Sequence, residues 1–372
     1  MSKLIFANSK DSNMLYAVGQ YIADPFFYLE KGNKKYIFLD YREFAAFQEK
    51  KQKSKIEVML SNDLAKKTKK IKDKTSESNK LALVILTEFN LLDKEIKVPA
   101  NFSIDMADFL RSKGITLKIE SPFFPKREKK NKTEIKLIKE SINATVSAFK
   151  KIEEILKESV IVGDKIYFQE KILTSEFLKK EVDRLLLEKN MFNQEDIIIS
   201  SGYQTAIPHH TGGGEIKPNT FIICDIFPRN RTSGYFADMT RTFVKGKAST
   251  KMLSIYDAVK KAQEKAIKSI KPGIKAKEIH QICEKSFEKD GFKTRGNRGF
   301  IHGTGHSFGL DIHEGPYLNS LSENVLEVGN VITVEPGLYF PKFGGVRIED
   351  DILVTKNGYE NLVKYPKSLI IK

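Results

Sequence analysis

Histidine is distributed unevenly along this chain of 372 residues. All six histidines lie in the second half, and five of them fall in two glycine-containing stretches, IPHHTGGGE and FIHGTGHSFGLDIHEGP. Glycine lets the backbone approach a ligand closely, and imidazole can bind a metal ion or move a proton near neutral pH. A single histidine is more often a hydrogen-bonded core residue, which is our interpretation of His280, but five of them in glycine turns favour a functional site. The five are His209, His210, His302, His306 and His313.

Two predicted β-hairpins bring acidic residues together. The runs NTFIICDIF and GYFADMTRTF flank the turn sequence PRNRTSG, so Asp225 and Asp238 are expected nearly opposite each other across two strands. The runs VITVEPGLYF and GGVRIEDDILV flank a turn at 341–345 and present Glu335 and Glu349 in the same way. One such pair could equally be charges at solvated strand ends. Two pairs beside runs as apolar as FIIC and VITV indicate a buried place, where cations usually balance the charge.

Four carboxylates and one imidazole form an oxygen-rich ligand set, which suits manganese, cobalt, iron or zinc. Two divalent ions would balance the four negative charges. Two such ions roughly 3.5 to 4 Å apart would turn a bridging water into a nucleophile and polarise a carbonyl group, which is hydrolytic chemistry. The predicted ligands are Asp225, Asp238, His306, Glu335 and Glu349.

The elements that must position these residues fall into two predicted domains. Residues up to about 121 alternate strand-like runs with polar helical stretches, an α/β pattern. The segment SPFFPKREKKNKTE resembles an interdomain linker, so we expect domains at 1–125 and 126–372. Apolar residues at steps of three or four between 135 and 156 predict a long amphipathic helix that opens the second domain. The predicted strands of the first domain are 35–40, 55–60, 81–86 and 115–119.

The composition argues against several classes of protein. Hydrophobic residues make up 40% and charged residues 30% of the chain, which fits a globular protein with a sizeable core. We recognise no signal peptide or spanning segment and expect a cytoplasmic protein. Two cysteines provide neither a disulfide framework nor a cysteine-rich zinc site. A net charge of +15 raises nucleic acid as a partner, but the densest basic runs lack interleaved aromatic residues, so this partner is not expected.

Around these residues, from about 133 to 368, the sequence resembles the pita-bread metallopeptidases, the family of Xaa-Pro aminopeptidases, prolidases, methionine aminopeptidases and creatinase. The motifs occur in family order: an aspartate at a strand end, DMTRTF, HGTGH, VEPG and RIED. The resemblance implies an α+β catalytic domain, with two related halves around a strongly curved antiparallel sheet. The first domain is more faintly similar to the smaller α/β domain of creatinase and prolidase, most of all in YREF. Methionine aminopeptidases usually lack that domain, so the proline-directed branch is favoured.

The resemblance also implies an activity. It is that of a dinuclear-metal exopeptidase, which hydrolyses the Xaa-Pro bond at the N-terminus of peptides or in Xaa-Pro dipeptides through a metal-bridging hydroxide. The two ions would be Mn2+ first, with Co2+, Zn2+ or Fe2+ as alternatives, and the protein would be a homodimer. Glu335 would bind metal and move the proton, His209 and His313 would hydrogen-bond the carbonyl oxygen, and His302 would line the proline pocket. Arg347 would orient a ligand carboxylate or a substrate end, or form a supporting ion pair.

Two alternatives stay open. The PRNRTSG turn is longer than is common in the family, and its Arg229 and Arg231 could clasp the terminal carboxylate of a dipeptide. Exposed arginines are usually only solvated, which weakens this argument for a dipeptidase. A dipeptidase and an aminopeptidase are therefore equally favoured. The second alternative is a non-catalytic pita-bread protein that binds RNA or a protein partner through its basic surface.

Overall fold

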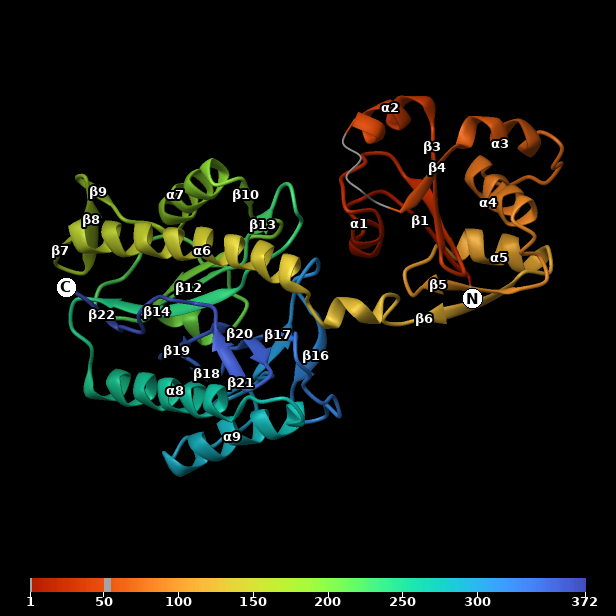
Figure 1. Cartoon of the computed structure of the whole chain (residues 1–372). Coiled ribbons are helices and arrows are strands. Elements are labelled where there is room, and N and C mark those ends of the chain that lie inside the picture. The colour runs from red at the N-terminus through yellow and green to blue at the C-terminus, as the bar shows by residue number, and fades with distance from the viewer. Residues whose placement is uncertain (1, 50–54) are drawn as a thin grey trace. The chain divides into compact units, whose positions relative to one another are not determined.

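The computed structural model describes residues 2–49 and 55–372. The chain divides into two compact units, Met1–Pro125 and Lys126–Lys372. Figure 1 shows the first in red to orange and the second in yellow to blue. The boundary lies inside the segment from 121 to 134, where the short 3-10 helix Pro125–Glu128 precedes the first long helix.

The first unit is built on a six-stranded mixed sheet. Its order is β4-β3-β2-β1-β5-β6, in which β1, β2 and β3 are antiparallel and the outer pairings are parallel. Apolar side chains on the two faces of the sheet form two separate hydrophobic clusters. The strands are β1 Ser2–Ala7, β2 Phe26–Lys31, β3 Lys34–Leu39, β4 Ile56–Leu60, β5 Glu95–Pro99 and β6 Thr116–Glu120. The helices are α1 Ser12–Val18, α2 Tyr41–Glu49, α3 Ser61–Thr68, α4 Glu77–Glu88 and α5 Ile104–Ser112.

Three of the four strands predicted in this unit are confirmed as β3, β4 and β6, but the prediction of a strand at 81–86 is wrong. These residues lie inside α4. Ser76 caps that helix by accepting a hydrogen bond from the backbone N–H of Asn79, and Glu77 follows in the first turn. A short apolar run such as LALVIL fits a buried strand or a buried helix equally well. The polar cap before the run decides for the helix.

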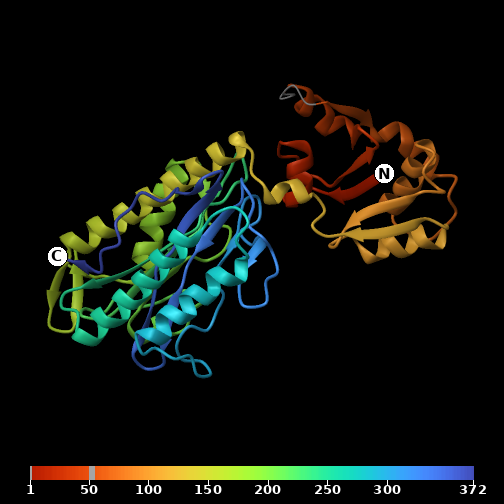
Figure 2. The same ribbon diagram turned by 60° about the horizontal axis from the view of Figure 1, so that its bottom comes forward.

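The second unit places its strands between two pairs of helices. In Figures 1 and 2, α6 and α7 lie on one side of the strands, and α8 and α9 lie on the other. The helices are α6 Lys132–Glu158, α7 Ser175–Glu188, α8 Thr250–Ser269 and α9 Ala276–Lys289. The helix predicted to open this domain is confirmed as α6, which begins at a capping box formed by Asn131 and Glu134.

Two sheets dominate the second unit, and their strands are antiparallel except for the parallel pair β14 and β22. The first has the order β11-β12-β14-β22, and the second has the order β16-β15-β17-β20-β21. Their strands are β11 Ile198–Ser201, β12 Ile222–Ile226, β14 Met239–Lys245, β22 Ile370–Ile371, β15 Gly305–Ser307, β16 Glu314–Leu318, β17 Val331–Val334, β20 Asp350–Thr355 and β21 Gly358–Asn361. Smaller pairings join β7 Val160–Val162, β8 Lys165–Phe168 and β9 Lys171–Ile172, then β10 Met191–Phe192 and β13 Arg229–Asn230, then β18 Gly337–Phe340 and β19 Gly344–Arg347.

Both predicted acidic hairpins form, the first with a register shifted from the one expected. In the first, Asp225 faces Thr240, and Asp238 lies just before β14. In the second, the predicted hairpin forms: β17 pairs with β20 and β18 pairs with β19 in one continuous register, with a break in the strand pairing between the two pairs. Glu335 and Glu349 lie at this break. Their backbone N–H groups donate to the carbonyl oxygens of Thr304 and Thr240, at 2.7 Å and 3.1 Å, rather than to each other's strand.

No helix within residues 2–49 and 55–372 is long and apolar enough to cross a membrane.

Candidate active site

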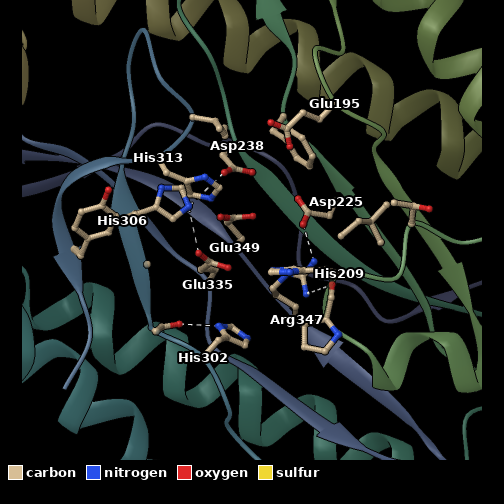
Figure 3. A pocket seen from close by; sticks show the side chains of 18 of the residues that line it. Glu195, His209, Asp225, Asp238, His302, His306, His313, Glu335, Arg347 and Glu349 are labelled. Atoms are coloured by element: carbon tan, nitrogen blue, oxygen red, sulfur yellow. Dashed lines mark hydrogen bonds and ion pairs between the residues drawn. The ribbon is translucent and has the colours of Figure 1, made fainter. Parts of the chain in front are cut away.

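A cavity of about 500 Å³ opens among the strand ends of the second unit. It is lined from both acidic hairpins and from the two histidine stretches (Figure 3). The structure brings all the site residues predicted from the sequence to this one cavity: His209, Asp225, Asp238, His302, His306, His313, Glu335, Arg347 and Glu349. Two of these residues, His209 and Glu349, lie 140 positions apart in sequence and still line the same cavity.

Three of the predicted ligands form a compact buried cluster. One ligand atom from each of Asp238, His306 and Glu349 lies within 4.8 Å of the others. Nε2 of His306 is 3.7 Å from Oδ2 of Asp238 and 3.4 Å from Oε1 of Glu335. Two carboxylates and an imidazole are therefore close enough together to bind a single ion, and the carboxylate of Glu335 lies beside them.

The orientation of His306 is set by its neighbours in the sheet. Gly305 before it allows β15 to approach β17, since a Cβ atom there would lie 2.1 Å from the carbonyl oxygen of Thr333. Nδ1 of His306 is 3.1 Å from the carbonyl oxygen of Ser307, which places the proton on Nδ1 and leaves the Nε2 lone pair facing the carboxylates. Burial, and then His313, lower the pKa of His306 to about 3, so the ring is neutral, as a metal ligand must be.

Asp225 is held from one side only. Its Oδ2 accepts a hydrogen bond of 2.6 Å from Nη2 of Arg347. Its Oδ1 is buried and has no hydrogen-bond partner among the described residues. A buried carboxylate oxygen without a partner costs free energy, and a cation is the group that would satisfy it.

Three carboxyl groups of the cavity have raised pKa values. Burial, followed by the charge of nearby carboxylates, raises the pKa values of Asp238 and Glu349 well above their ordinary range. Burial raises the pKa of Glu335 to about 7, with Asp225 adding to the effect and Arg347 opposing it. Bound cations would reverse these shifts by favouring the charged forms. The donor set, its burial and the unpartnered Asp225 oxygen all fit divalent metal ions.

The other histidines lie around the ligand cluster. The exposed side chains of His209 and His313 line the cavity, and the His313 ring lies 4.4 Å from the ring of His306, centroid to centroid. Nε2 of His302 is 2.9 Å from the hydroxyl of Tyr339, and its Nδ1 is 2.7 Å from the carbonyl oxygen of Gly303. Burial and then the charge of Arg347 lower the pKa of His302 to about 3, so this ring is neutral.

A model of metallopeptidase family M24 matches residues 136–356 of this chain. An Xaa-Pro dipeptidase of Pyrococcus horikoshii is 34% identical over 298 residues, which cover 76% of this chain and 83% of that protein. The chain belongs to metallopeptidase family M24. The prediction of a metallopeptidase of this family is confirmed.

Solved structures support the fold of this M24 chain. An Xaa-Pro dipeptidase from Bacillus anthracis has a TM-score of 0.82 at 26% identity, covering 100% of this chain and 95% of that one. The prolidase from Pyrococcus furiosus has a TM-score of 0.78 at 26% identity, covering 98% and 96%. The prediction of a pita-bread catalytic domain preceded by a smaller α/β domain is confirmed.

In this M24 chain Arg347 supports the site from within. It is 3% exposed, and besides Asp225 it donates to the Tyr339 hydroxyl at 2.8 Å and to the carbonyl oxygen of Pro208 at 3.3 Å. An ion pair of Arg347 with the carboxylate of Asp225, a predicted ligand, is present. Tyr339 links Arg347 to His302, and sequence reasoning missed it because in GLYF it reads as an ordinary core aromatic of a strand.

A second group of residues that the sequence did not reveal holds the segment around His313. Lys130, at 5% exposure, donates to Oε1 of Glu314 at 2.6 Å and to the Ser307 hydroxyl at 2.9 Å. Arg127 donates to Asp311 at 2.6 Å and to the other oxygen of Glu314 at 2.7 Å. Both cations come from the basic run interpreted as a linker, so part of that run is structural. Only the low exposure of these long side chains distinguishes them from the solvated lysines around them.

The turn arginines do not reach the cavity of the M24 site. The expectation of a solvated side chain is wrong for Arg229, which is 5% exposed and lies over the Phe236 ring. Its guanidinium donates to the carbonyl oxygen of Gly234 at 3.0 Å and to Oε1 of Gln194 at 2.9 Å, because the turn folds back on itself. Arg231 is exposed, as expected. His210 also stays outside the cavity, where its Nδ1 accepts from the backbone of Gly212.

Proposed function

We propose that this chain is an exopeptidase that uses two divalent ions to hydrolyse the bond before proline, at the N-terminus of peptides or in Xaa-Pro dipeptides. The observation that carries this proposal is the meeting of four carboxylates and one neutral imidazole in one cavity, with Oδ1 of Asp225 buried and lacking a partner in the part of the chain that is described. The similar proteins from Pyrococcus horikoshii and Bacillus anthracis are Xaa-Pro dipeptidases, which supports the substrate class.

The ligands for the ions would come from both hairpins. Asp238, His306 and Glu349 already cluster, and Asp225 and Glu335 stand beside them with oxygens facing the cavity. An oxygen-rich set with one imidazole suits Mn2+, with Co2+, Zn2+ and Fe2+ as alternatives. When bound, two such ions would supply an acidified water as nucleophile and would polarise the carbonyl of the scissile bond.

The residues of the chain would move the proton and hold the oxygen. Glu335, whose pKa is raised to about 7 by burial, would take a proton from the attacking water and deliver it to the leaving proline nitrogen. His209 and His313 would donate hydrogen bonds to the carbonyl oxygen as it gains negative charge. His302, kept neutral and bonded to Tyr339, would form one wall for the proline ring. The homodimer and the cytoplasmic location stay predictions.

Metal replacement tests this proposal. The protein is treated with a chelator, reloaded with Mn2+, Co2+ or Zn2+, and assayed on an Xaa-Pro dipeptide, its C-terminally extended form and the corresponding Xaa-Ala peptides. We expect no turnover after chelation, recovery with metal, and cleavage of the proline peptides only. Equal cleavage of Xaa-Ala peptides would refute the proline specificity. No metal-dependent cleavage, together with RNA binding that weakens steeply with salt, would favour the non-catalytic alternative.

A further inference from the structure

Two acidic residues that line the cavity, Glu195 and Asp196, lie outside the ligand set, and Asp196 is paired with Lys179. Glu195 lies in the segment between β10 and β11, is exposed, and lines the same cavity as the proposed ligands. Figure 3 shows it at the end of the view where Asp238 and Asp225 lie, opposite His302. Across residues 2–49 and 55–372, Glu195 has no hydrogen bond or ion pair from a side chain. The cavity wall thus carries one carboxylate without a partner.

The segment that carries Glu195 is anchored on both sides. Gln194 before it accepts a hydrogen bond of 2.9 Å from the buried Arg229. Asp196 after it pairs with Lys179, with Nζ at 2.9 Å and 3.0 Å from its two oxygens. Asn193 donates to Asp183 at 2.6 Å. The residues on both sides of Glu195 are therefore fixed by hydrogen bonds and an ion pair. These contacts hold the segment in place, with the carboxylate of Glu195 at the cavity.

The position of Glu195 in the cavity places it near the substrate residue that precedes proline. This step rests on the proposed function, in which the proline ring lies against His302 and the scissile carbonyl lies near Glu335 and His313. The residue before proline must then extend away from His302, towards the end of the cavity with Asp238 and Glu195. The guanidinium of Arg347 also lines the cavity, but it is bound to Asp225 and Tyr339 and therefore does not neutralise Glu195.

We propose that Glu195 selects substrates whose first residue carries a cationic side chain, so that Lys-Pro and Arg-Pro peptides are favoured. A carboxylate at a partly enclosed wall attracts an ammonium or guanidinium group more strongly than it would in open water. The same charge disfavours an acidic first residue by repulsion, which adds to specificity. Norleucine has nearly the shape of lysine without its charge. Comparing Lys-Pro with norleucine-Pro peptides therefore isolates the electrostatic effect of the side chain.

The test compares specificity constants for Lys-Pro, norleucine-Pro and Glu-Pro peptides, each as a dipeptide and with one added C-terminal alanine, using metal-loaded protein. For the wild type we expect lysine to exceed norleucine by about threefold to tenfold, and the excess to shrink at high salt. Glu195→Gln should make the two equal, and Glu195→Lys should turn the preference towards Glu-Pro. Glu188→Gln makes the same change of charge at an exposed position of α7 outside the cavity and should keep the preference of the wild type.

The outcomes separate this inference from the proposed function. An unchanged ratio of lysine to norleucine in Glu195→Gln would overturn it. An equal fall in the specificity constants of both peptides in Glu195→Gln would also overturn it, because Glu195 would then contact the α-amino group that both peptides share. Failure of the metal-loaded wild type to cleave any proline peptide would instead overturn the proposed function, and this inference with it.

Discussion

Nη2 of Arg347 lies 2.6 Å from Oδ2 of Asp225 and leaves Oδ1 of the same carboxylate buried and without a partner within the described ranges. The guanidinium fixes the orientation of the aspartate, while the second oxygen stays available to a cation. One aspartate is thus shared between a structural ion pair and the proposed metal site.

Replacing this arginine should weaken metal binding. In Arg347→Lys the ammonium cannot reproduce the contacts to Asp225, Tyr339 and Pro208 at once. We expect the affinity for Mn2+ and the value of kcat/KM each to fall by about 10 to 100-fold, measured by calorimetric titration and by peptide cleavage. Tyr339→Phe removes one of these contacts and should have a smaller effect. Unchanged metal affinity in Arg347→Lys would show that Arg347 does not support the ligand.

Removal of one negative charge tests the role of Glu349. Glu349→Gln keeps the size of the side chain and can still accept from the Thr240 hydroxyl, which lies 2.8 Å from Oε2. We expect the fold to persist, as judged by circular dichroism, with fewer metal ions per chain by elemental analysis and with reduced activity. Full metal content with activity near that of the wild type would refute the assignment of Glu349 as a ligand.

The two exposed histidines should matter for turnover rather than for metal. His209→Ala and His313→Ala are each expected to lower kcat by about 10² to 10³-fold, because a donor to the developing oxyanion is lost. Metal content should stay that of the wild type. The matched control is His210→Ala, since this neighbour bonds the backbone of Gly212 outside the cavity. Loss of metal in the His209 or His313 variant would make that residue a ligand.

The raised carboxyl pKa values predict a pH dependence of the metal-free protein. Because the pKa values of Asp238, Glu335 and Glu349 are higher in the folded chain than in the unfolded chain, the folded state binds more protons between the two values. Stability of the metal-free form should therefore decrease as pH rises from about 4 through about 7. Metal ions replace these protons and remove the cost. His306 acts in the opposite direction, because its pKa is lowered to about 3 in the folded chain and the unfolded chain therefore binds more protons up to about pH 6.5. Its ring is neutral in both the metal-free and the metal-bound folded chain, so its contribution cancels when the two forms are compared.

Thermal unfolding with and without metal from pH 5 to pH 8 measures this effect. We expect the difference in Tm between the two forms to grow with pH, and metal binding at neutral pH to release protons, detected by calorimetry in buffers of different ionisation enthalpy. The comparison of the two forms cancels groups elsewhere in the chain. A difference in Tm that shrinks as pH rises would contradict the shared protonation of the cluster.

The turn arginines should not read a substrate carboxylate. Neither Arg229 nor Arg231 lines the cavity. The variant Arg229→Ala with Arg231→Ala is therefore expected to keep the ratio of specificity constants for an Xaa-Pro dipeptide and its amidated form. Arg229→Ala alone should lower the free energy of unfolding by about 1 to 3 kcal/mol, because hydrogen bonds of a buried cation are lost. A changed ratio in the double variant would restore the idea of an arginine clasp.

The sequence by itself determined the fold family of this protein and named the residues that meet in its cavity as proposed ligands. Apolar runs that end in Asp225, Asp238, Glu335 and Glu349 are local patterns, and their order along the chain identifies the architecture without any knowledge of contacts. The long helix α6 and the strands β3, β4 and β6 were also readable, because periodicity and turn residues act over a few positions.

Only the tertiary structure decided which atoms meet. It placed Oδ2 of Asp225 on Arg347, separated by 122 positions, and Lys130 on Glu314, separated by 184. It buried Arg229, left Glu195 facing the cavity, and broke the second hairpin at its two glutamates. These outcomes depend on packing between segments far apart in sequence, which local periodicity does not encode. An identical lysine or arginine can be solvated or buried, and its surroundings in space choose between the two.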